Sequence, residues 1–216
     1  MSSKKALFLK VKHLFDFIGA VLLLALLIPL FAMIAAAIKL ESRGPVFFRQ
    51  NRLGINGATF SIFKFRTMIR NAVSIGTGLS TFDGDPRVTR IGYTLRKYRL
   101  DELPQLINVL LGQMSLVGPR PLLPDYIEAY SENDKKRMLM PPGMTGWQQV
   151  NGGATHTWQE RIESDVWYVE HWGLLLDMII LSRTPYVVFK ANTVYGGDGW
   201  QKCGVPDGQL ARREGD

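Results

Sequence analysis

The feature that most constrains this 216-residue chain is an apolar segment, residues 17–38, which carries no ionisable side chain. As a straight helix it would reach roughly 33 Å, close to the hydrocarbon thickness of a bilayer. The run is longer than the core of a signal peptide, and no small-residue cleavage site follows it. Its simplest interpretation is a single transmembrane helix.

Two features favour a different path for this helix. Pro29 lies in its middle, where it removes a helix hydrogen bond and costs about 3 kcal/mol in an ordinary helix. Both flanks are basic, and the positive-inside rule places basic flanks in the cytoplasm. The basic residues are Lys4, Lys5, Lys10 and Lys12 before the segment and Lys39, Arg43, Arg49 and Arg52 after it. A re-entrant helix that bends at Pro29 and returns to the same membrane face fits both observations slightly better than a spanning helix.

Charge and cysteine content narrow the function classes. The net charge of +7 and the pI near 9.6 predict an anionic partner, either lipid headgroups, phosphates or nucleic acid. No nucleic-acid-binding motif accompanies the charge, so we expect membrane lipid or phosphate and no nucleic acid. Cys203 is the single cysteine, which excludes an internal disulfide and fits a reducing compartment. His13, His156 and His171 show no metal-ligand spacing.

The chain after the apolar segment reads as a mixture of extended and helical pieces. Residues 45–68 are predicted to form a β-hairpin, because two apolar runs flank Asn56-Gly57, a strong turn signal. Residues 70–87 are rich in Gly, Ser, Thr and Asp and are predicted to be a loop. Helical spacing of apolar residues predicts a helix from near Asp101 to Gly112. Another helix is expected over 124–139, where Pro141-Pro142-Gly143 would end it.

The C-terminal part adds one more apolar helix and a tail. Residues 173–191 contain Asp177, Arg183 and Pro185, so they predict a buried or interfacial amphipathic helix rather than a membrane span. Four tryptophans precede or begin this region, and headgroup contact and core packing are equally compatible with them: Trp147, Trp158, Trp167 and Trp172. The tail is polar and rich in glycine.

Together these elements predict an α+β fold, mostly helical with a small β-hairpin, an N-terminal re-entrant membrane helix and interfacial amphipathic helices. The expected domain boundaries are 1–39 for the basic segment and membrane helix, 40–195 for a cytoplasmic catalytic domain, and 196–216 for the tail. Asp16 is predicted to cap the membrane helix or to pair with a neighbouring lysine.

The stretch most informative about chemistry is residues 96–105. Asp101 and Glu102 open a predicted helix, and three cations precede them, namely Arg96, Lys97 and Arg99. An adjacent Asp and Glu at a helix start usually only cap the helix and complement its dipole. The surrounding arginines change this interpretation, because they and the helix N-terminus would bind phosphate. An ionised Asp is a nucleophile, and a neighbouring Glu is a ligand for Mg²⁺, so the parts suit phosphoryl transfer.

Several motifs occur in order along nearly the whole chain, from about residue 12 to residue 188. They are Lys-His-Leu-Phe-Asp (12–16), Gly-Pro-Val-Phe-Phe-Arg-Gln (44–50), Phe-Lys-Phe-Arg-Thr-Met (63–68), Asp-Pro-Arg-Val-Thr (85–89), Leu-Asp-Glu-Leu-Pro-Gln (100–105), Met-Ser-Leu-Val-Gly-Pro-Arg-Pro (114–121) and the loop Gly-Met-Thr-Gly-Trp-Gln-Gln-Val-Asn-Gly (143–152). With this set of motifs the chain resembles the bacterial sugar transferase family, the monotopic phosphoglycosyl transferases.

The resemblance implies a reaction and a location. A sugar-1-phosphate would pass from a UDP-sugar to polyprenyl (undecaprenyl) phosphate with release of UMP, as the first membrane step of polysaccharide or glycoconjugate assembly. The enzyme would act at the cytoplasmic face of the bacterial inner membrane as a monotopic protein that contacts membrane lipid. Downstream glycosyltransferases are possible partners. The rival interpretation is a catalytically inactive, membrane-anchored assembly protein of a polysaccharide pathway.

The resemblance also implies roles for single residues. Asp101 would attack the sugar-linked phosphorus and form a covalent phosphosugar intermediate, and Glu102 would complete the catalytic pair and bind Mg²⁺. The substrate-binding residues would be Lys64, Arg96, Arg120, Arg87 and Gln149, and Pro29 would bend the membrane helix.

Three positions depart from the family pattern. His13 follows Lys12 where many relatives have a basic pair, Ile28 precedes the membrane proline where some small relatives have Ser, and Gly153 stands where Arg is common. These departures leave the identity of the sugar open. They do not change the reaction that the resemblance implies.

Overall fold

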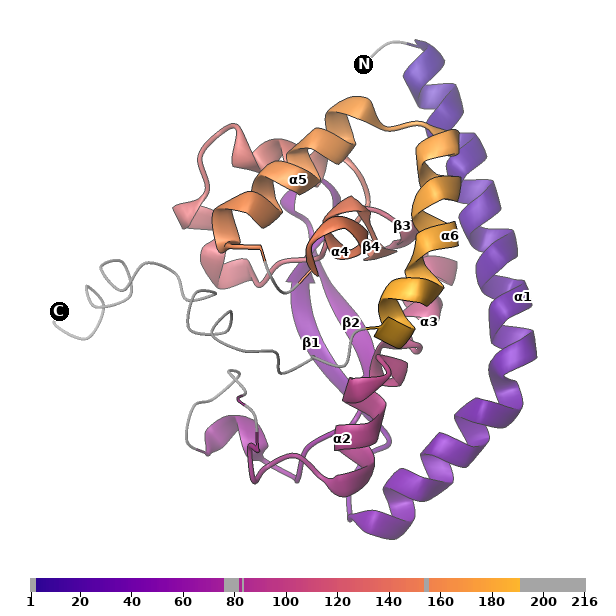
Figure 1. Ribbon diagram of the computed structural model, residues 1–216, viewed down its shortest axis with the longest axis vertical. Coiled ribbons are helices and arrows are strands. Elements are labelled where there is room, and N and C mark those ends of the chain that lie inside the picture. The colour runs from indigo at the N-terminus through magenta and orange to yellow at the C-terminus, as the bar shows by residue number, and fades with distance from the viewer. Residues whose placement is uncertain (1–2, 76–81, 83, 154–155, 191–216) are drawn as a thin grey trace, which may run out of the picture.

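The computed structural model describes residues 3–75, 82, 84–153 and 156–190. The described part is mostly helical with two small sheets of two strands each. Figure 1 shows one long helix, α1, running along the length of the molecule, with the other elements gathered on one side of it. The predicted mostly helical α+β class with a small hairpin is confirmed. The tail 196–216 lies outside the described residues.

Helix α1 spans Ser3–Glu41, 39 residues with Pro29 inside. Figure 1 shows that the helix bends in its lower half without being interrupted, and proline is a common cause of such a bend. Within the described residues, α1 is the one helix long and apolar enough to cross a membrane, with a mean hydropathy of 2.9 over its most apolar window. Large apolar side chains on its outer faces are exposed, among them Leu22, Leu26 and Met33. The helix therefore has the length and surface for membrane association.

The opposite face of α1 packs on the rest of the molecule along a continuous seam. The buried residues of this seam are Lys12, Asp16, Ala20, Ile34 and Ile38. Their spacing of four residues within each half places them on one face of the helix. Because the seam includes residues before and after Pro29, both halves of α1 contact the same domain.

The N-terminal part of the seam is an unusual buried polar cluster. Lys12 Nζ donates to Asp177 Oδ2 at 2.6 Å and lies 3.7 Å from Asp16 Oδ2, which confirms the predicted pairing of Asp16 with a lysine. Asp16 also accepts hydrogen bonds from Ser115 Oγ at 2.7 Å and from the Leu116 amide at 3.1 Å. Lys12, expected to belong to the basic flank, is thus buried and ties α1 to another helix.

The predicted hairpin is confirmed as strands β1 (Phe47–Leu53) and β2 (Thr59–Phe65), which pair antiparallel from Phe47↔Phe65 to Leu53↔Thr59. The turn between them holds a short 3₁₀ helix, Ile55–Gly57. Asn56 and Gly57 have φ values of 53° and 78°. These left-handed conformations are the reason that an Asn-Gly pair suits the turn.

The end of β2 is attached to the end of α1. Arg66 donates to the main-chain oxygens of Ser42 at 2.8 Å and of Arg43 at 3.0 Å, so it binds carbonyls at the C-terminus of the long helix. Glu41 in turn accepts from the amides of Arg90 and Ile91 at the start of helix α2 (Arg90–Lys97). These contacts fix the orientation of α1 relative to β2 and α2.

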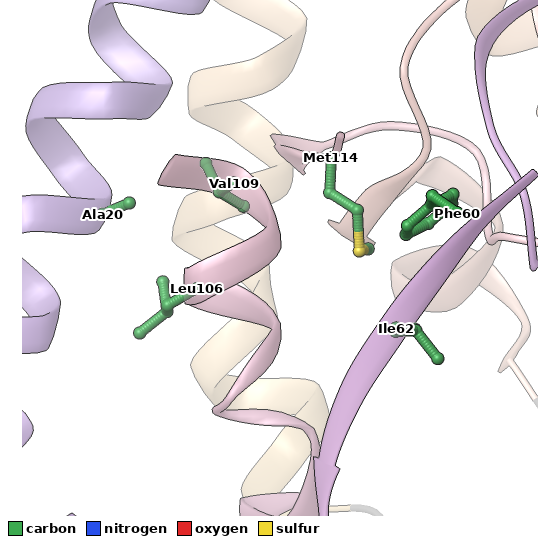
Figure 2. Close-up of a cluster of buried hydrophobic side chains, with 6 residues drawn as sticks. All are labelled: Ala20, Phe60, Ile62, Leu106, Val109 and Met114. Atoms are coloured by element: carbon green, nitrogen blue, oxygen red, sulfur yellow. The ribbon is translucent and has the colours of Figure 1, made fainter. Parts of the chain in front are cut away.

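Helix α3 (Gln105–Leu110) lies between α1 and the hairpin. Figure 2 shows the apolar cluster that joins these elements, with Ala20 of α1 directed toward the helix that carries Leu106 and Val109, and with Met114 close to Phe60. The predicted helix from Asp101 to Gly112 is confirmed in part, because a 3₁₀ turn, Leu100–Glu102, comes first and Pro104 separates it from α3. Pro lacks the amide proton needed to continue the turn.

Buried Asn108 attaches α3 to the hairpin. Its amide accepts from the Phe63 main chain at 3.0 Å and donates to the Ser61 carbonyl at 2.8 Å, which satisfies main-chain groups of β2. These two bonds hold α3 opposite β2.

Strands β3 (Ser115–Val117) and β4 (Gly143–Thr145) form a parallel pair. A Cβ on Gly118 would lie 2.4 Å from the Pro141 carbonyl oxygen, so glycine is required for this close approach. Residues 143–152, expected to be a loop, instead form β4 and the short helix α4 (Trp147–Asn151).

The single helix expected over 124–139 is wrong. The structure has two 3₁₀ helices, Pro124–Ala129 and Asp134–Leu139. Tyr130 is extended after the first piece. In the link that follows, the Ser131 amide donates to Asp134 Oδ2 at 3.0 Å while the Ser131 hydroxyl accepts from the Asp134 amide. Such local side-chain bonds compete with helix continuation. The loop expected over 70–87 contains one 3₁₀ turn, Ala72–Ser74, and part of it lies outside the described residues.

Helices α5 (Trp158–His171) and α6 (Leu174–Lys190) complete the fold, and α6 agrees with the helix predicted over 173–191. Asp177 of α6 is buried and accepts from Tyr168 of α5 at 2.6 Å as well as from Lys12. The outward residues of α6 include exposed Leu175, Met178 and Phe189. Trp147 stacks on Trp167 with ring centroids 4.7 Å apart, and Trp172 donates to Asp177.

Gly92 allows α2 to lie against the end of β2. A Cβ at this position would lie 2.0 Å from the Thr67 carbonyl oxygen, which is main chain and cannot turn aside. We expect Gly92→Ala to destabilise the fold by about 3 kcal/mol through overpacking, measured as a lower melting temperature in detergent. Gly173→Ala is the matched control, because nothing lies within 4 Å of its Cβ. Equal melting temperatures for both variants would contradict the prediction.

Candidate active site

Asp101 and Glu102 occupy the 3₁₀ turn between α2 and α3. Arg99, just before the turn, has the left-handed values φ 54° and ψ 21°, which reverse the chain after α2. The core around α3 then fixes the turn against the hairpin. The two carboxylates therefore lie on a sharp, well-supported turn and not within a long helix.

Two cations from distant parts of the chain hold Glu102. Lys64 of β2 donates to Glu102 Oε1 at 2.7 Å, and Arg120 donates to the same oxygen at 3.1 Å. Burial would raise the pKa of Glu102, but Arg120 and Lys64 outweigh it and hold the pKa well below its usual value. Glu102 is therefore an anion fixed by two charged hydrogen bonds.

Asp101 has a different environment. Burial raises the pKa of Asp101 to about 6, and the negative charge of Glu102 adds to the rise, whereas Lys64, Arg96 and Arg99 oppose it. At neutral pH the carboxylate is still mostly ionised, but it is poorly solvated. A poorly solvated anion beside several cations is suited to attack an electrophile that carries negative charge.

Arg96 is held near Asp101 by a contact with the segment after β2. Its Nε donates to Thr67 Oγ1 at 2.8 Å, so a residue two positions beyond β2 positions the arginine of α2. The predicted site residues Lys64, Arg96, Arg120, Asp101 and Glu102 are thus brought together from β2, α2, the 3₁₀ turn and the segment after β3.

The titration of Asp101 can be measured without substrate or metal. Carbodiimide reacts with protonated carboxyl groups, so labelling of Asp101 should rise as the pH falls through about 6. Glu102→Gln removes a negative neighbour and should move this midpoint to lower pH. The measurement is peptide mass spectrometry after labelling in EDTA. A midpoint near 4, or one unchanged by Glu102→Gln, would contradict the described electrostatics.

The other predicted substrate-binding residues have structural surroundings of their own. Arg87 is buried, pairs with Asp85 at 2.7 Å and donates to the carbonyls of Ala72 and Ile75, so it organises the segment before α2. Gln149 of α4 lies beside Gly146, and its buried amide has no hydrogen-bond partner among the described residues. Substrate contact by either residue stays a prediction.

The donor set bears on the predicted Mg²⁺. No group of three or more His, Cys, Asp and Glu that could hold a metal occurs among the described residues. Two neighbouring carboxylates still fit Mg²⁺, because this ion commonly takes one or two protein carboxylates together with substrate phosphates and water. The hydrogen bonds from Lys64 and Arg120 both use Glu102 Oε1. Magnesium binding stays a prediction.

The sequence places Arg99 among the cations before the two carboxylates but predicts no individual role for it. The structure places its charge beside Arg120, Glu102 and Asp101, and burial lowers the pKa of its guanidinium. Thr67 was likewise unassigned. The left-handed conformation of Arg99 is unusual for a residue other than Gly and has no local sequence signal.

A carboxylate pair among several cations is compatible with phosphoryl-group transfer, and comparison with known proteins specifies the family. Residues 7–191 match the family described as bacterial sugar transferase. The chain belongs to this family and is a sugar transferase.

Individual relatives agree with this assignment. The chain is 44% identical over 173 residues to the uncharacterised sugar transferase EpsL of Bacillus subtilis, which covers 80% of this chain and 84% of EpsL. It is 44% identical over 193 residues to UDP-glucose:undecaprenyl-phosphate glucose-1-phosphate transferase of Caulobacter vibrioides, covering 85% and 72%. It is 41% identical over 180 residues to UDP-N-acetylgalactosamine-undecaprenyl-phosphate N-acetylgalactosaminephosphotransferase of Aeromonas hydrophila, covering 81% of this chain but 42% of that longer protein.

Proposed function

We propose that this protein transfers a sugar-1-phosphate from a UDP-sugar to undecaprenyl phosphate and releases UMP. The observation that carries the proposal is the Asp101–Glu102 pair, surrounded by Lys64, Arg96, Arg99 and Arg120. The substrates are those named for relatives that act on UDP-glucose or UDP-N-acetylgalactosamine with undecaprenyl phosphate. Because those two relatives differ in sugar, the sugar is left open.

The proposed chemistry has two displacements at one phosphorus. A carboxylate oxygen of Asp101 attacks the sugar-linked phosphorus, the bond from that phosphorus to the bridging oxygen breaks, and the electron pair leaves with UMP. A phosphate oxygen of undecaprenyl phosphate then attacks the same phosphorus. The Asp101–phosphorus bond breaks and restores the carboxylate, which leaves undecaprenyl diphosphate carrying the sugar.

The cations of the site support both displacements. Arg96, Arg99, Lys64 and Arg120 supply positive charge where the diphosphate and the lipid phosphate must both lie. Such fixed charge stabilises the transferring phosphoryl group. Glu102 is the residue proposed to hold Mg²⁺, and a bound Mg²⁺ supplies further neutralisation of phosphate charge.

The buried seam of α1 is the observation from which we propose how the protein lies in the membrane. Lys12 and Ile38 both pack on the domain, although a helix separates them by about 39 Å, more than the hydrocarbon thickness. If α1 spanned the bilayer, the charged domain along the seam would be submerged, at a large desolvation cost. A re-entrant α1 that bends at Pro29, with α6 at the interface, keeps the site on one membrane face. We place that face in the cytoplasm, at the inner membrane, where UDP-sugars are present.

Isotope exchange tests the two-step reaction. In detergent, without lipid acceptor, the enzyme should exchange labelled UMP into a UDP-sugar, because the first step is reversible and needs no undecaprenyl phosphate. A panel of UDP-glucose, UDP-galactose, UDP-N-acetylglucosamine and UDP-N-acetylgalactosamine identifies the sugar. Addition of undecaprenyl phosphate should then give net UMP release. Net release without any exchange would rule out the covalent route, and neither activity with any sugar would rule out the proposed function.

A further inference from the structure

A buried ion pair contacts the main chain of Arg120. Arg137 from the 3₁₀ helix Asp134–Leu139 and Asp165 from α5 pair through Nη2 and Oδ2, and their side chains are 4% and 1% exposed. The same Nη2 donates to the Arg120 carbonyl oxygen at 3.1 Å. The pair therefore contacts the main chain of a residue whose side chain reaches Glu102.

The pKa of Asp165 shows that its charged form is costly at this buried position. Burial raises the pKa of Asp165 to about 6, while Arg137 and the Arg120 main chain oppose the rise. A buried ion pair is often no more stabilising than apolar residues of the same shape. Stability alone is thus a weak explanation for charged residues at these two positions.

The aim of the Arg120 side chain depends on its main chain. The side chain is 42% exposed, so packing alone does not hold it. Its neighbours Pro119 and Pro121 have restricted φ angles, and their carbonyls accept from the Gly143 amide at 2.8 Å and from Arg52 at 3.4 Å. The carbonyl of Arg120 itself accepts from Arg137, which is paired with Asp165.

We propose that the Asp165–Arg137 pair is a positioning element for sugar-phosphate transfer, which fixes the Arg120 main chain so that the Arg120 guanidinium stays on Glu102. Neither residue touches the reacting groups. The inference rests on the proposed function for its kinetic consequence, but the position of Arg120 can be tested without turnover.

The first arm measures that position. Phenylglyoxal modifies arginines that are free of ion pairs, and peptide mass spectrometry gives the rate at Arg120. Asp165→Asn should raise this rate several-fold, and Glu102→Gln should raise it similarly, because both release the guanidinium. In the Glu102→Gln background, Asp165→Asn should add no further increase.

The second arm measures kinetics. Asp165→Asn should lower kcat/KM ten- to hundredfold, because small displacements of catalytic groups have effects of about this size. In the Arg120→Met background the same substitution should change kcat/KM less than twofold. A purely structural role predicts the same fold loss in both backgrounds.

Matched variants separate positioning from stability. Val166→Ala removes buried volume in α5 next to Asp165, and Lys136→Met breaks the exposed Lys136–Glu170 pair between the same two elements. The first should lower the melting temperature, and neither should change the phenylglyoxal rate at Arg120. If Asp165→Asn does not fold, Arg137→Lys serves, since it keeps the charge pair but lacks the guanidinium fork.

The proposal is overturned if the Arg120 modification rate is unchanged by both Asp165→Asn and Arg137→Lys, or if the kinetic losses multiply with that of Arg120→Met. Absence of turnover by the unmodified protein would count against the proposed function. The phenylglyoxal arm would still decide whether the pair positions Arg120.

Discussion

Asp101→Asn should abolish covalent labelling of the protein by a UDP-sugar labelled in the sugar, and should reduce UMP release by roughly a thousandfold or more. The amide keeps the shape of the side chain but has no anionic oxygen to attack phosphorus. Acid quenching followed by peptide mapping should place the label of the unchanged protein on the peptide that contains Asp101. The size of the effect follows from the proposed role, since the first bond formed with the substrate would be to this residue.

Two further variants make the experiment specific to Asp101. Asp125→Asn changes an exposed Asp of the segment after β3 and should label as the unchanged protein does. Glu102→Gln should retain a carboxylate nucleophile but lose the Mg²⁺ dependence of turnover. Equal labelling of Asp101→Asn and the unchanged protein would refute the nucleophile assignment, and unchanged Mg²⁺ dependence in Glu102→Gln would refute its metal role.

Lys12→Met should destabilise the protein by about 3–5 kcal/mol, the usual result of leaving one charge of a buried pair without its partner. Lys12 and Asp177 have side chains 4% and 8% exposed and form an ion pair of 2.6 Å. Asp177 is also an acceptor for Tyr168 and Trp172, so its carboxylate would remain buried with neutral donors only. The measurement is a thermal melt in detergent.

A second substitution should restore much of that loss. In Lys12→Met/Asp177→Asn the buried charge of Asp177 is removed, while the amide oxygen can still accept from Tyr168 and Trp172. Asp16 is then the one carboxylate of this cluster left without Lys12, and it keeps its hydrogen bonds from Ser115 and Leu116. Lys135→Met is the control, because its pair with Glu132 is exposed and contributes less than about 1 kcal/mol. If the double variant melted no higher than Lys12→Met, the loss would have to come from packing of the lysine stem rather than from the unpaired carboxylate.

Local signals predicted part of this fold well. The Asn56-Gly57 turn identified the hairpin because only a few residue types adopt its left-handed conformations. The apolar run and Pro29 similarly identified the bent helix. The expected helix over 124–139 was wrong because Ser131 and Asp134 bond to each other's main chain, a competition that apolar spacing does not reveal. Thr157 and Glu160 form a capping box at the start of α5, and their spacing of three residues is a local signal for the start of a helix.

The site was predicted less completely, for a physical reason. The motifs predicted Lys64, Glu102 and Arg120 as site residues. That Lys64 and Arg120 both bind Oε1 of Glu102 depends on the packing of α3 against β2. Arg99 required a main-chain conformation that no local pattern encodes. Arg137 and Asp165 lie in segments with no phosphate-binding character, and only their contact with the Arg120 main chain relates them to the site.

The seam on α1 has a consequence for how this helix can vary. Each inserted or deleted residue would rotate the following part of the helix by about 100°. A single insertion between Ala20 and Ile34 would thus turn either Ile34 or Lys12 away from the domain. Exposed positions such as Leu22 and Leu26 can accept other apolar residues, but the number of residues in the segment is fixed, because both halves of the helix must face the domain. Membrane insertion alone would tolerate a range of lengths, whereas this helix can change length only by whole turns.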